Sequence, residues 1–254
     1  MSRIFILTMF LLSTDSLRGY GINRIFSFAK DAGFGGIELA MDVRLFDTQN
    51  AEYLKSLKTQ YGLPVQVVSA FANSTIKQTS LVLETAYALG AKVVVLEPPR
   101  FFDFKYKDWI KKQVPLLRKK YNLMVALKNG PSEYLWGFLP GRSMSSIPDL
   151  QNFKEVCLDV SNLFEKKIDL MRAYDVMKPY LRHVHLSNVY RGIDHNVLEN
   201  GIMPLESFLT KLNNDGYDHD ITLLVKPKVL SAGDDKAVMK TLEKQLKFYS
   251  RYMG

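Results

Sequence analysis

The sequence predicts an α/β fold, a single (β/α)8 TIM barrel in which residues 1–254 form one domain. The chain has 254 residues, close to the roughly 250 that eight β/α units occupy. A unit made of a polar helix, a glycine and a short apolar run recurs, and no change of composition divides the chain. The alternative is an open doubly wound sheet, but neither a Gly-x-Gly-x-x-Gly motif after the first strand nor a P-loop supports it.

Eight short apolar runs are predicted to form the barrel strands, because such runs are typical of strands buried on both faces. They span residues 4–8, 36–40, 65–69, 93–97, 123–127, 156–159, 182–186 and 221–225. Between them, apolar residues at three- and four-residue spacing predict helices over 24–32, 51–60, 75–89 and 236–253. Glycines that follow several of these helices, such as Gly33 and Gly62, fit the left-handed position after a helix end.

The net charge of +8 allows a nucleic-acid partner, an anionic small substrate or only solubility. Its densest part, residues 105–120, alternates basic and apolar residues at helical spacing, which predicts a solvated helix face. The single cysteine, Cys157, excludes an internal disulfide and a cysteine-built zinc site, so a cytoplasmic location is expected. No membrane segment is predicted, since the apolar run over 4–12 is too short to cross a bilayer and is explained as a buried first strand.

Polar side chains mark several of the points where predicted strands end. Barrel enzymes place their chemistry at these ends. A connection over 129–152, which contains Arg142, follows the fifth strand, and connections of this length are often functional. We therefore expect it on the same face of the barrel as the strand ends. The residues at those ends are Glu38, Phe71, Glu97, Lys128, Asp159, His185 with Asn188, and Leu224 with Lys226.

Several motifs, in this order, resemble those of the xylose isomerase-like barrels. They are Gly-Phe-Gly-Gly-Ile-Glu-Leu at 33–39, Leu-Asp at 158–159, His-Val-His-Leu-Ser-Asn at 183–188, His195, and the segments 198–205 and 216–225. That superfamily includes sugar and sugar-phosphate isomerases and epimerases, inosose isomerase- or dehydratase-like proteins, and endonuclease IV. The resemblance covers nearly the whole chain and implies the same barrel fold.

The resemblance also implies a metal centre, held in metal-containing members by Glu, Asp, His and Glu from strands five to eight. Asp159 and His185 match this pattern, but Lys128 and Leu224 stand at the two glutamate positions. Asn188 stands at a secondary carboxylate position. One carboxylate and one imidazole are too few for a zinc or hard-metal site. We therefore expect no metal ligands and no cofactor, although the superfamily implies a divalent metal.

The departure at Lys128 leads to a specific hypothesis. An ammonium group repels a divalent cation but can neutralise Asp159, so Lys128 is predicted to replace the metal electrostatically beside Asp159 and His185. In one interpretation, Lys128, Asp159 and His185 are catalytic residues, with Lys128 as a base or an electrostatic catalyst on a carbonyl or sugar substrate. In the other, the centre has lost its activity and the pair only keeps the barrel mouth neutral.

Further residues are candidates for substrate binding around this centre. Glu38 and Glu97 could line the pocket, and Arg142 and Arg191 could bind a phosphate or carboxylate. His195 could reach the site from a loop, and Asn188 lies after the seventh strand. His183 is expected to point out of the barrel and to be a packed residue.

The best functional label is a sugar or sugar-phosphate isomerase or epimerase that lacks most of the usual metal site. The alternative is a non-catalytic barrel that binds a sugar, a phosphate or a protein partner at the same mouth. Endonuclease IV-like chemistry is disfavoured, because no histidine precedes His183 and Phe71 stands where the third strand would need one. The expected partner is a small sugar or sugar phosphate; a nucleic acid or a membrane is not expected, and a homo-oligomer is left open.

Overall fold

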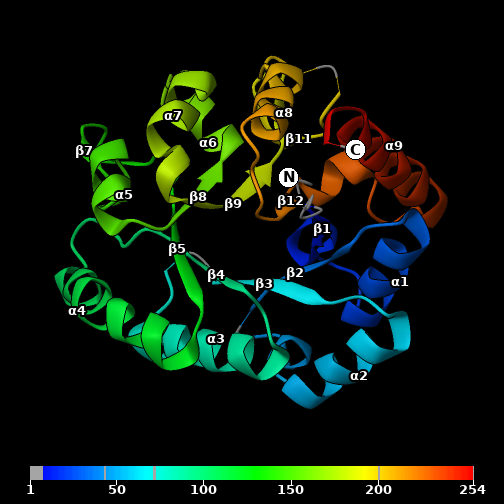
Figure 1. The fold of residues 1–254 in the computed structure, drawn as a ribbon, viewed down its shortest axis with the longest axis horizontal. Helices are drawn as coiled ribbons and strands as arrows, with labels where there is room; N and C mark the ends of the chain where they lie inside the picture. The colour runs from blue at the N-terminus through cyan, green and yellow to red at the C-terminus, as the bar shows by residue number, and fades with distance from the viewer. Residues whose placement is uncertain (1–7, 43, 71–72, 200, 254) are drawn as a thin grey trace, which may run out of the picture.

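The computed structural model describes residues 8–253 except residues 43, 71–72 and 200. Eight parallel strands close into a barrel at the centre of the molecule, with the helices around them, which confirms the predicted fold class (Figure 1). Around the barrel the strands follow the order β1, β2, β3, β4, β5, β8, β9, β12. They are β1 (Phe10–Ser13), β2 (Gly36–Ala40), β3 (Val65–Ser69), β4 (Val93–Leu96), β5 (Met124–Lys128), β8 (Val156–Asp159), β9 (Leu181–Leu186) and β12 (Ile221–Leu223).

The helices occupy the segments between strands. The α-helices are α1 (Ile22–Ala32), α2 (Ala51–Tyr61), α3 (Ile76–Leu89), α4 (Phe104–Tyr121), α5 (Ile147–Phe153), α6 (Val160–Glu165), α7 (Leu170–Met177), α8 (Leu205–Asn214) and α9 (Asp235–Met253). Short 3-10 helices span Thr14–Leu17, Phe46–Thr48, Lys178–Tyr180 and Pro227–Leu230. Gly33 and Gly62 end α1 and α2 in the predicted left-handed conformation, with φ of 94° and 62°.

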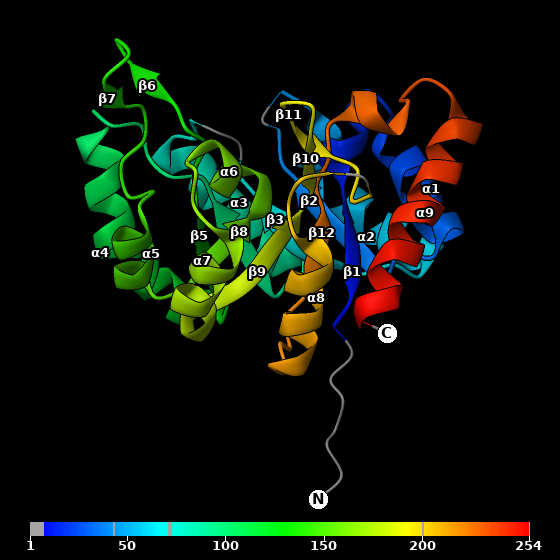
Figure 2. The same ribbon diagram turned by 90° about the horizontal axis from the view of Figure 1, so that it is seen from above.

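Two small hairpins are added to the barrel at the same end of the strands. One is β6 (Tyr134–Leu135) with β7 (Leu139–Pro140), inside the long connection after β5. The other is β10 (Asn188–Tyr190) with β11 (Ile193–Asn196), directly after β9. Figure 2 shows both hairpins rising above this end of the barrel. The predicted location of the long connection at the strand ends is therefore correct.

The first strand differs from the prediction. The predicted strand over 4–8 lies outside the described residues except for Thr8, which is in no strand, and the barrel begins instead at Phe10. The apolar run continues to Leu12, and its last residues pair with Gly36 and Ile37 of β2. The last strand is also shorter than predicted and ends at Leu223.

The barrel has two apolar regions. A small interior cluster joins Leu11, Val67, Val93, Val95, Ala126 and Cys157, and a larger cluster fills the space between strands and helices. In α4 the buried face carries Tyr106, Ile110 and Val114, whereas most of the lysines are exposed. The basic stretch is therefore a solvated helix face, as the spacing predicted. None of the described helices combines the length and apolarity of a membrane span.

Candidate functional site

Lys128 lies at the end of β5, between carboxylates from two neighbouring strands. Its ammonium Nζ is 2.5 Å from Oε1 of Glu97, which follows β4, and 3.8 Å from Oδ2 of Asp159 at the end of β8. The Lys128 and Asp159 side chains are thus within ion-pair reach, as the sequence suggested, but Glu97 is the closer partner. Burial would lower the pKa of Lys128, yet the two carboxylates outweigh burial and raise this pKa above its ordinary value.

Asp159 is completely buried, and the surrounding groups hold it as a charged carboxylate. Its Oδ1 accepts a hydrogen bond from the Asn162 backbone N–H, which caps α6, and its Oδ2 lies 3.1 Å from Nε2 of His195. The Asn129 side chain bonds the Asp159 backbone twice, at 2.6 and 2.9 Å. Burial would raise the pKa of Asp159, but His195, His185 and Lys128 together lower it well below its ordinary value.

His195 reaches this centre from the hairpin β10–β11. While its Nε2 faces Asp159, its Nδ1 lies 2.8 Å from Oδ2 of Asp194, and Asp194 also pairs with Lys226 after β12. Burial opposes a charge on His195, but Asp159 and Asp194 raise its pKa to about 9. His195 is therefore protonated at neutral pH and bridges two carboxylates. The sequence analysis predicted that His195 could reach the site. It did not predict that Asp194 would pair with the second ring nitrogen of His195.

Below this layer, Glu38 from β2 meets two histidines of β9. Oε2 of Glu38 lies 3.1 Å from Nε2 of His183 and 3.1 Å from Nε2 of His185, and His183 also bonds Oγ1 of Thr222. The prediction that His183 points out of the barrel was wrong. Residues two apart in a strand point to the same face, so His183 points inward with His185.

Burial lowers the pKa of His183, which leaves it neutral. Burial also opposes a charge on His185, but Cys157, Glu38 and Asp159 raise its pKa well above the ordinary value. Among the described residues, Glu38, His183 and His185 are the one group whose ligand atoms, all within 4.8 Å of one another, could hold a metal ion. In the structure Oε2 of Glu38 bonds both Nε2 atoms, so Glu38 and His185 form an ion pair beneath Asp159. The Nδ1 atoms of His183 and His185 are buried and have no hydrogen-bond partner among the described residues.

The partly exposed side chains of the site are those of Lys128, Glu97 and His195, which lie around buried Asp159. Asp159 is 0% exposed, whereas Lys128, Glu97 and His195 are 12%, 15% and 18% exposed. A cavity of about 190 Å³ reaches Glu97 and is lined also by Asn73, Arg100 and Tyr106. A ligand at the barrel mouth would therefore meet Lys128, Glu97 and His195 first.

Three other predicted binding residues are engaged elsewhere. The guanidinium of Arg142 lies 2.9 Å from Glu133 and 3.1 Å from Asn73, and the side chain is buried. The Asn188 amide is buried and bonds backbone groups of Val189, Leu198 and Met203. Arg191 is exposed in the turn between β10 and β11 and lies over the ring of Tyr190.

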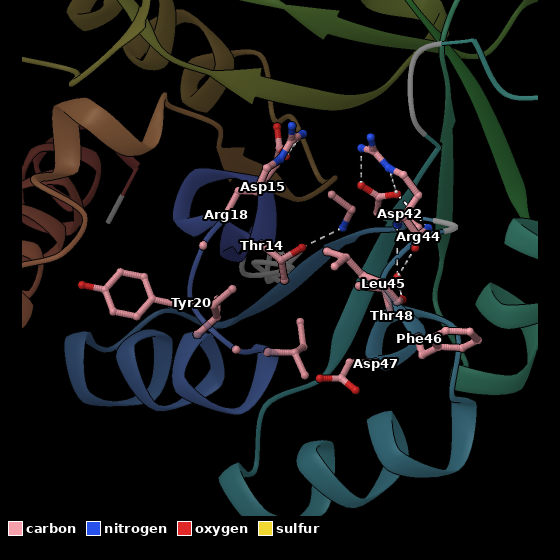
Figure 3. Close-up of a pocket in the computed structure, with 15 residues that line it drawn as sticks. Thr14, Asp15, Arg18, Tyr20, Asp42, Arg44, Leu45, Phe46, Asp47 and Thr48 are labelled. Atoms are coloured by element: carbon pink, nitrogen blue, oxygen red, sulfur yellow. Dashed lines mark hydrogen bonds and ion pairs between the residues drawn. The ribbon is translucent and has the colours of Figure 1, made fainter.

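A further pocket of about 380 Å³ lies between the loops that follow β1 and β2 (Figure 3). Its two arginines are each paired within the pocket, Arg18 with Asp15 and Arg44 with Asp42. Asp47 adds a third carboxylate to the lining. Because carboxylates outnumber arginines, this pocket does not have the charge of a phosphate site.

The model of the xylose isomerase-like TIM barrel family matches residues 26–242. The chain belongs to this family. A crystal structure of D-psicose 3-epimerase with D-tagatose from Clostridium cellulolyticum H10 is similar in fold, with a TM-score of 0.73, 12% identity, and 97% of this chain and 99% of that chain covered. The probable 3-DHS dehydratase AsbF from Bacillus anthracis gives a TM-score of 0.69 and 15% identity, with 96% and 99% covered. An uncharacterized protein of Mycobacterium tuberculosis strain H37Rv is 23% identical over 90% of this chain and 92% of its own length.

In this xylose isomerase-like barrel, two residues depart from the metal-binding pattern of the family, Lys128 and Leu224. Both lie at the strand ends where the sequence analysis placed them. Lys128 ends β5, and Leu224 follows β12 with its backbone N–H bonded to Leu186. Phe71, at the end of the third strand, lies outside the described residues. The sequence analysis did not predict the pairing of Glu97 with Lys128. It could have done so, because Glu97 and Lys128 stand at the ends of adjacent strands of the predicted barrel.

Proposed function

We propose that the chain is a sugar or sugar-phosphate isomerase or epimerase that works without a divalent metal, with the ammonium of Lys128 in the place of the cation. The observation that carries the proposal is the position of Nζ of Lys128 at the barrel mouth, 2.5 Å from Glu97 and 3.8 Å from Asp159. Membership of the xylose isomerase-like family supports the substrate class.

The groups around Lys128 do not fit a divalent cation at this position. The ammonium already neutralises Asp159, and it would repel a metal ion placed against the same carboxylate. Nε2 of His185 is bonded to Glu38, and Leu224 offers no ligand atom. Among the described residues, the carboxylates of Asp159 and Glu97 are both paired with this ammonium, and Nε2 of His195 is paired with Asp159. The free set of three or more ligand atoms that metal sites in proteins need as a rule is therefore missing at this position.

The chemistry that fits is proton transfer beside a carbonyl group. Lys128 stays protonated because its pKa is raised, so it acts as a fixed positive charge and not as a base. A substrate oxygen that joins this ammonium would gain stabilisation as negative charge develops on it. Such a substrate would place a C–H bond beside the carboxylate of Glu97, which can accept the proton.

His195 supplies the complementary acid. Its pKa of about 9 keeps it protonated at neutral pH. Both ring N–H groups are donated to carboxylates, so a bound oxygen at the partly exposed ring would have to share the Nε2–H with Asp159 to receive the proton. Asp159 and His185 are held behind this layer, where they position His195 and Lys128. Compared with the sequence hypothesis, the catalytic set is therefore Lys128, Glu97 and His195, with Asp159 and His185 as positioning residues.

Exchange of substrate hydrogen with solvent tests the proposal without knowledge of the product. The protein is incubated in D₂O with D-fructose, D-psicose, D-tagatose, D-xylulose and their available phosphates, and deuterium uptake is followed by NMR. We expect uptake at a carbon next to the carbonyl for at least one compound, a loss of roughly 100-fold or more in Glu97→Gln and Lys128→Met, and no change in Lys111→Met on the exposed face of α4. Binding of these sugars without any exchange would overturn catalysis and favour a barrel that only binds them.

A further inference from the structure

A hairpin with exposed aromatic side chains projects beside the barrel mouth. It consists of β6, β7 and the turn between them, and Figure 2 shows it rising beyond the other elements at this end of the barrel. We call residues 134–140 the arm. Trp136 and Phe138 in its turn are 74% and 71% exposed. Soluble proteins rarely expose large apolar side chains together unless the patch binds something.

The backbone of Trp136 gives the same indication. Its φ of 51° lies in the left-handed region, which costs a residue other than glycine about 1–3 kcal/mol. Glycine or asparagine would fit such a turn better. A tryptophan at this position therefore lowers the stability of the turn, and strain of this kind is typical of residues that bind something.

The arm is held in a fixed position at its base. The Gly141 N–H donates a hydrogen bond to the Glu133 carbonyl at 2.7 Å, and the Phe101 N–H, from the connection after β4, donates one to the Gly141 carbonyl at 3.0 Å. The buried guanidinium of Arg142 bonds the Glu133 carboxylate at 2.9 Å. An arm held in this way loses little conformational freedom when it binds a partner.

A cleft of about 810 Å³ lies directly beside the arm. Its apolar walls are Phe101, Phe102, Tyr134 and Leu135. Trp136 does not line this cleft but stands next to it, since its ring lies 6.1 Å from that of Phe102. Drug-sized ligands, which are larger than an indole ring, bind in clefts of roughly 300–1,000 Å³. The cleft is therefore large enough for an aromatic side chain of another molecule.

The charges of this surface fit a second copy of the chain. Residues 134–141 include no charged residue, and the charged side chains that line the cleft are two arginines and two carboxylates, Arg100, Arg142, Asp103 and Glu133. Each copy carries a net charge of +8, so a contact between two copies needs a surface without excess basic charge. An acidic partner or a nucleic acid would instead favour a basic surface, such as the exposed lysines of α4.

We propose that two copies of the chain form a two-fold dimer in which the arm of each copy enters the cleft of the other, with the Trp136 ring against its aromatic walls. Because the arm and the cleft adjoin each other, a two-fold axis beside them lets both contacts form at once. The cleft shares Asn73, Arg100 and Asp103 with the cavity that reaches Glu97. The second copy would therefore form an outer wall of that cavity.

The exposed aromatic surface is large enough for such a dimer. Five aromatic side chains of the arm and of the connection after β4 are each more than half exposed: Phe102, Phe104, Tyr134, Trp136 and Phe138. An aromatic side chain buries about 150–250 Å², so together they offer roughly 500–800 Å² per copy. A stable interface buries about 800 Å² per partner, and these rings supply most of it.

Sedimentation equilibrium of the full chain between about 1 and 100 µM measures the dimer directly. We expect a dissociation constant of about 10 µM or tighter for wild type, weakened roughly tenfold or more in Trp136→Asn. Asparagine tolerates the left-handed conformation, so this variant removes the ring and keeps the turn. Tyr87→Ala is the matched control, because Tyr87 on α3 is 61% exposed and does not line the cleft; it should leave the dissociation constant unchanged.

A mixture of two variants tests whether the arm enters the cleft of the other copy. Trp136→Asn keeps the cleft but lacks the ring, whereas Phe101→Asp keeps the ring but places a carboxylate in the cleft wall. Neither variant alone retains an intact contact, and a mixed dimer retains one of the two. We therefore expect native mass spectrometry to show mixed dimers at a concentration where each variant alone is monomeric. Tyr134→Asp, at a 63% exposed position of the same wall, takes the place of Phe101→Asp if that variant does not fold.

Three results would overturn the inference. They are a wild-type chain that stays monomeric up to about 100 µM, a dimer that Trp136→Asn leaves intact, and variants that form no mixed dimer. The first would leave the arm to a different partner, and the other two would place the dimer contact elsewhere. The inference does not rest on the proposed function, since none of these measurements involves a substrate.

Discussion

Replacing Lys128 with methionine removes the ammonium between the carboxylates of Glu97 and Asp159 while it keeps most of the apolar stem. The side chain is 12% exposed and its two partners are 15% and 0% exposed, so the variant leaves buried negative charge behind. Removal of one partner of a buried ion pair commonly costs about 3–5 kcal/mol. Asp159 keeps His195 at 3.1 Å, so the loss falls mainly on Glu97. We therefore expect the free energy of unfolding to fall by about 3 kcal/mol, the lower end of that range.

Urea unfolding near pH 7 measures this loss. Lys111→Met on the exposed face of α4 serves as the control and should stay within about 0.5 kcal/mol of wild type. The double variant Glu97→Gln with Lys128→Met removes the orphaned charge as well, so it should recover at least about 1 kcal/mol relative to Lys128→Met alone. A loss below about 0.5 kcal/mol in Lys128→Met, or a double variant less stable than the single one, would refute the placement of Lys128 as a buried counter-charge.

Three further perturbations test the rest of the site. The pKa of His195 is about 9 in the folded chain, against an ordinary value of 6.5. The ion pairs of His195 therefore stabilise the fold fully below about pH 6.5 and no longer do so above about pH 9. In urea, the free energy of unfolding of His195→Asn should thus lie up to about 3 kcal/mol below that of wild type near pH 6, and this difference should shrink as the pH rises. A difference that does not depend on pH would contradict the prediction. Asn129→Ala removes both hydrogen bonds to the Asp159 backbone, so its free energy of unfolding, measured with heat or urea, should fall by about 2–4 kcal/mol. The control Asn213→Ala, at an exposed site, should lower it by less than about 1 kcal/mol. His183→Leu removes a donor to buried Glu38 and should cost about 1–3 kcal/mol; a neutral result would mean that His183 does not point into the barrel.

The fold could be predicted because β/α alternation is written in local patterns. Short apolar runs and glycines after helices depend on neighbouring residues only, and Gly33 and Gly62 end their helices as expected. The start of β1 was misplaced because the apolar run over 4–12, interrupted only by Thr8, gives no clear signal for the strand boundary within it.

The site could be predicted only in part. Lys128, Asp159 and His185 were found because strand order and the family pattern place them at one end of the barrel. The pairing of Lys128 with Glu97 depends on the side-chain conformations at the ends of β4 and β5, and these cannot be predicted from the sequence. The predicted role of Asn188 in substrate binding stays a prediction. Its amide bonds the backbone of the following loop, a contact that its position in the motif did not indicate.

Elemental analysis of the purified wild-type protein and of Lys128→Glu most directly tests the replacement of a metal by the Lys128 ammonium. Both proteins are dialysed against Mn²⁺, Zn²⁺ and Mg²⁺ in turn and then against metal-free buffer. We predict that the wild-type protein retains no stoichiometric metal and that Lys128→Glu, which adds a carboxylate beside Asp159 and His185, retains clearly more. Stoichiometric metal in the wild-type protein that is lost in Asp159→Asn would contradict the proposal, because it would place a metal ion where Lys128 is said to take its place.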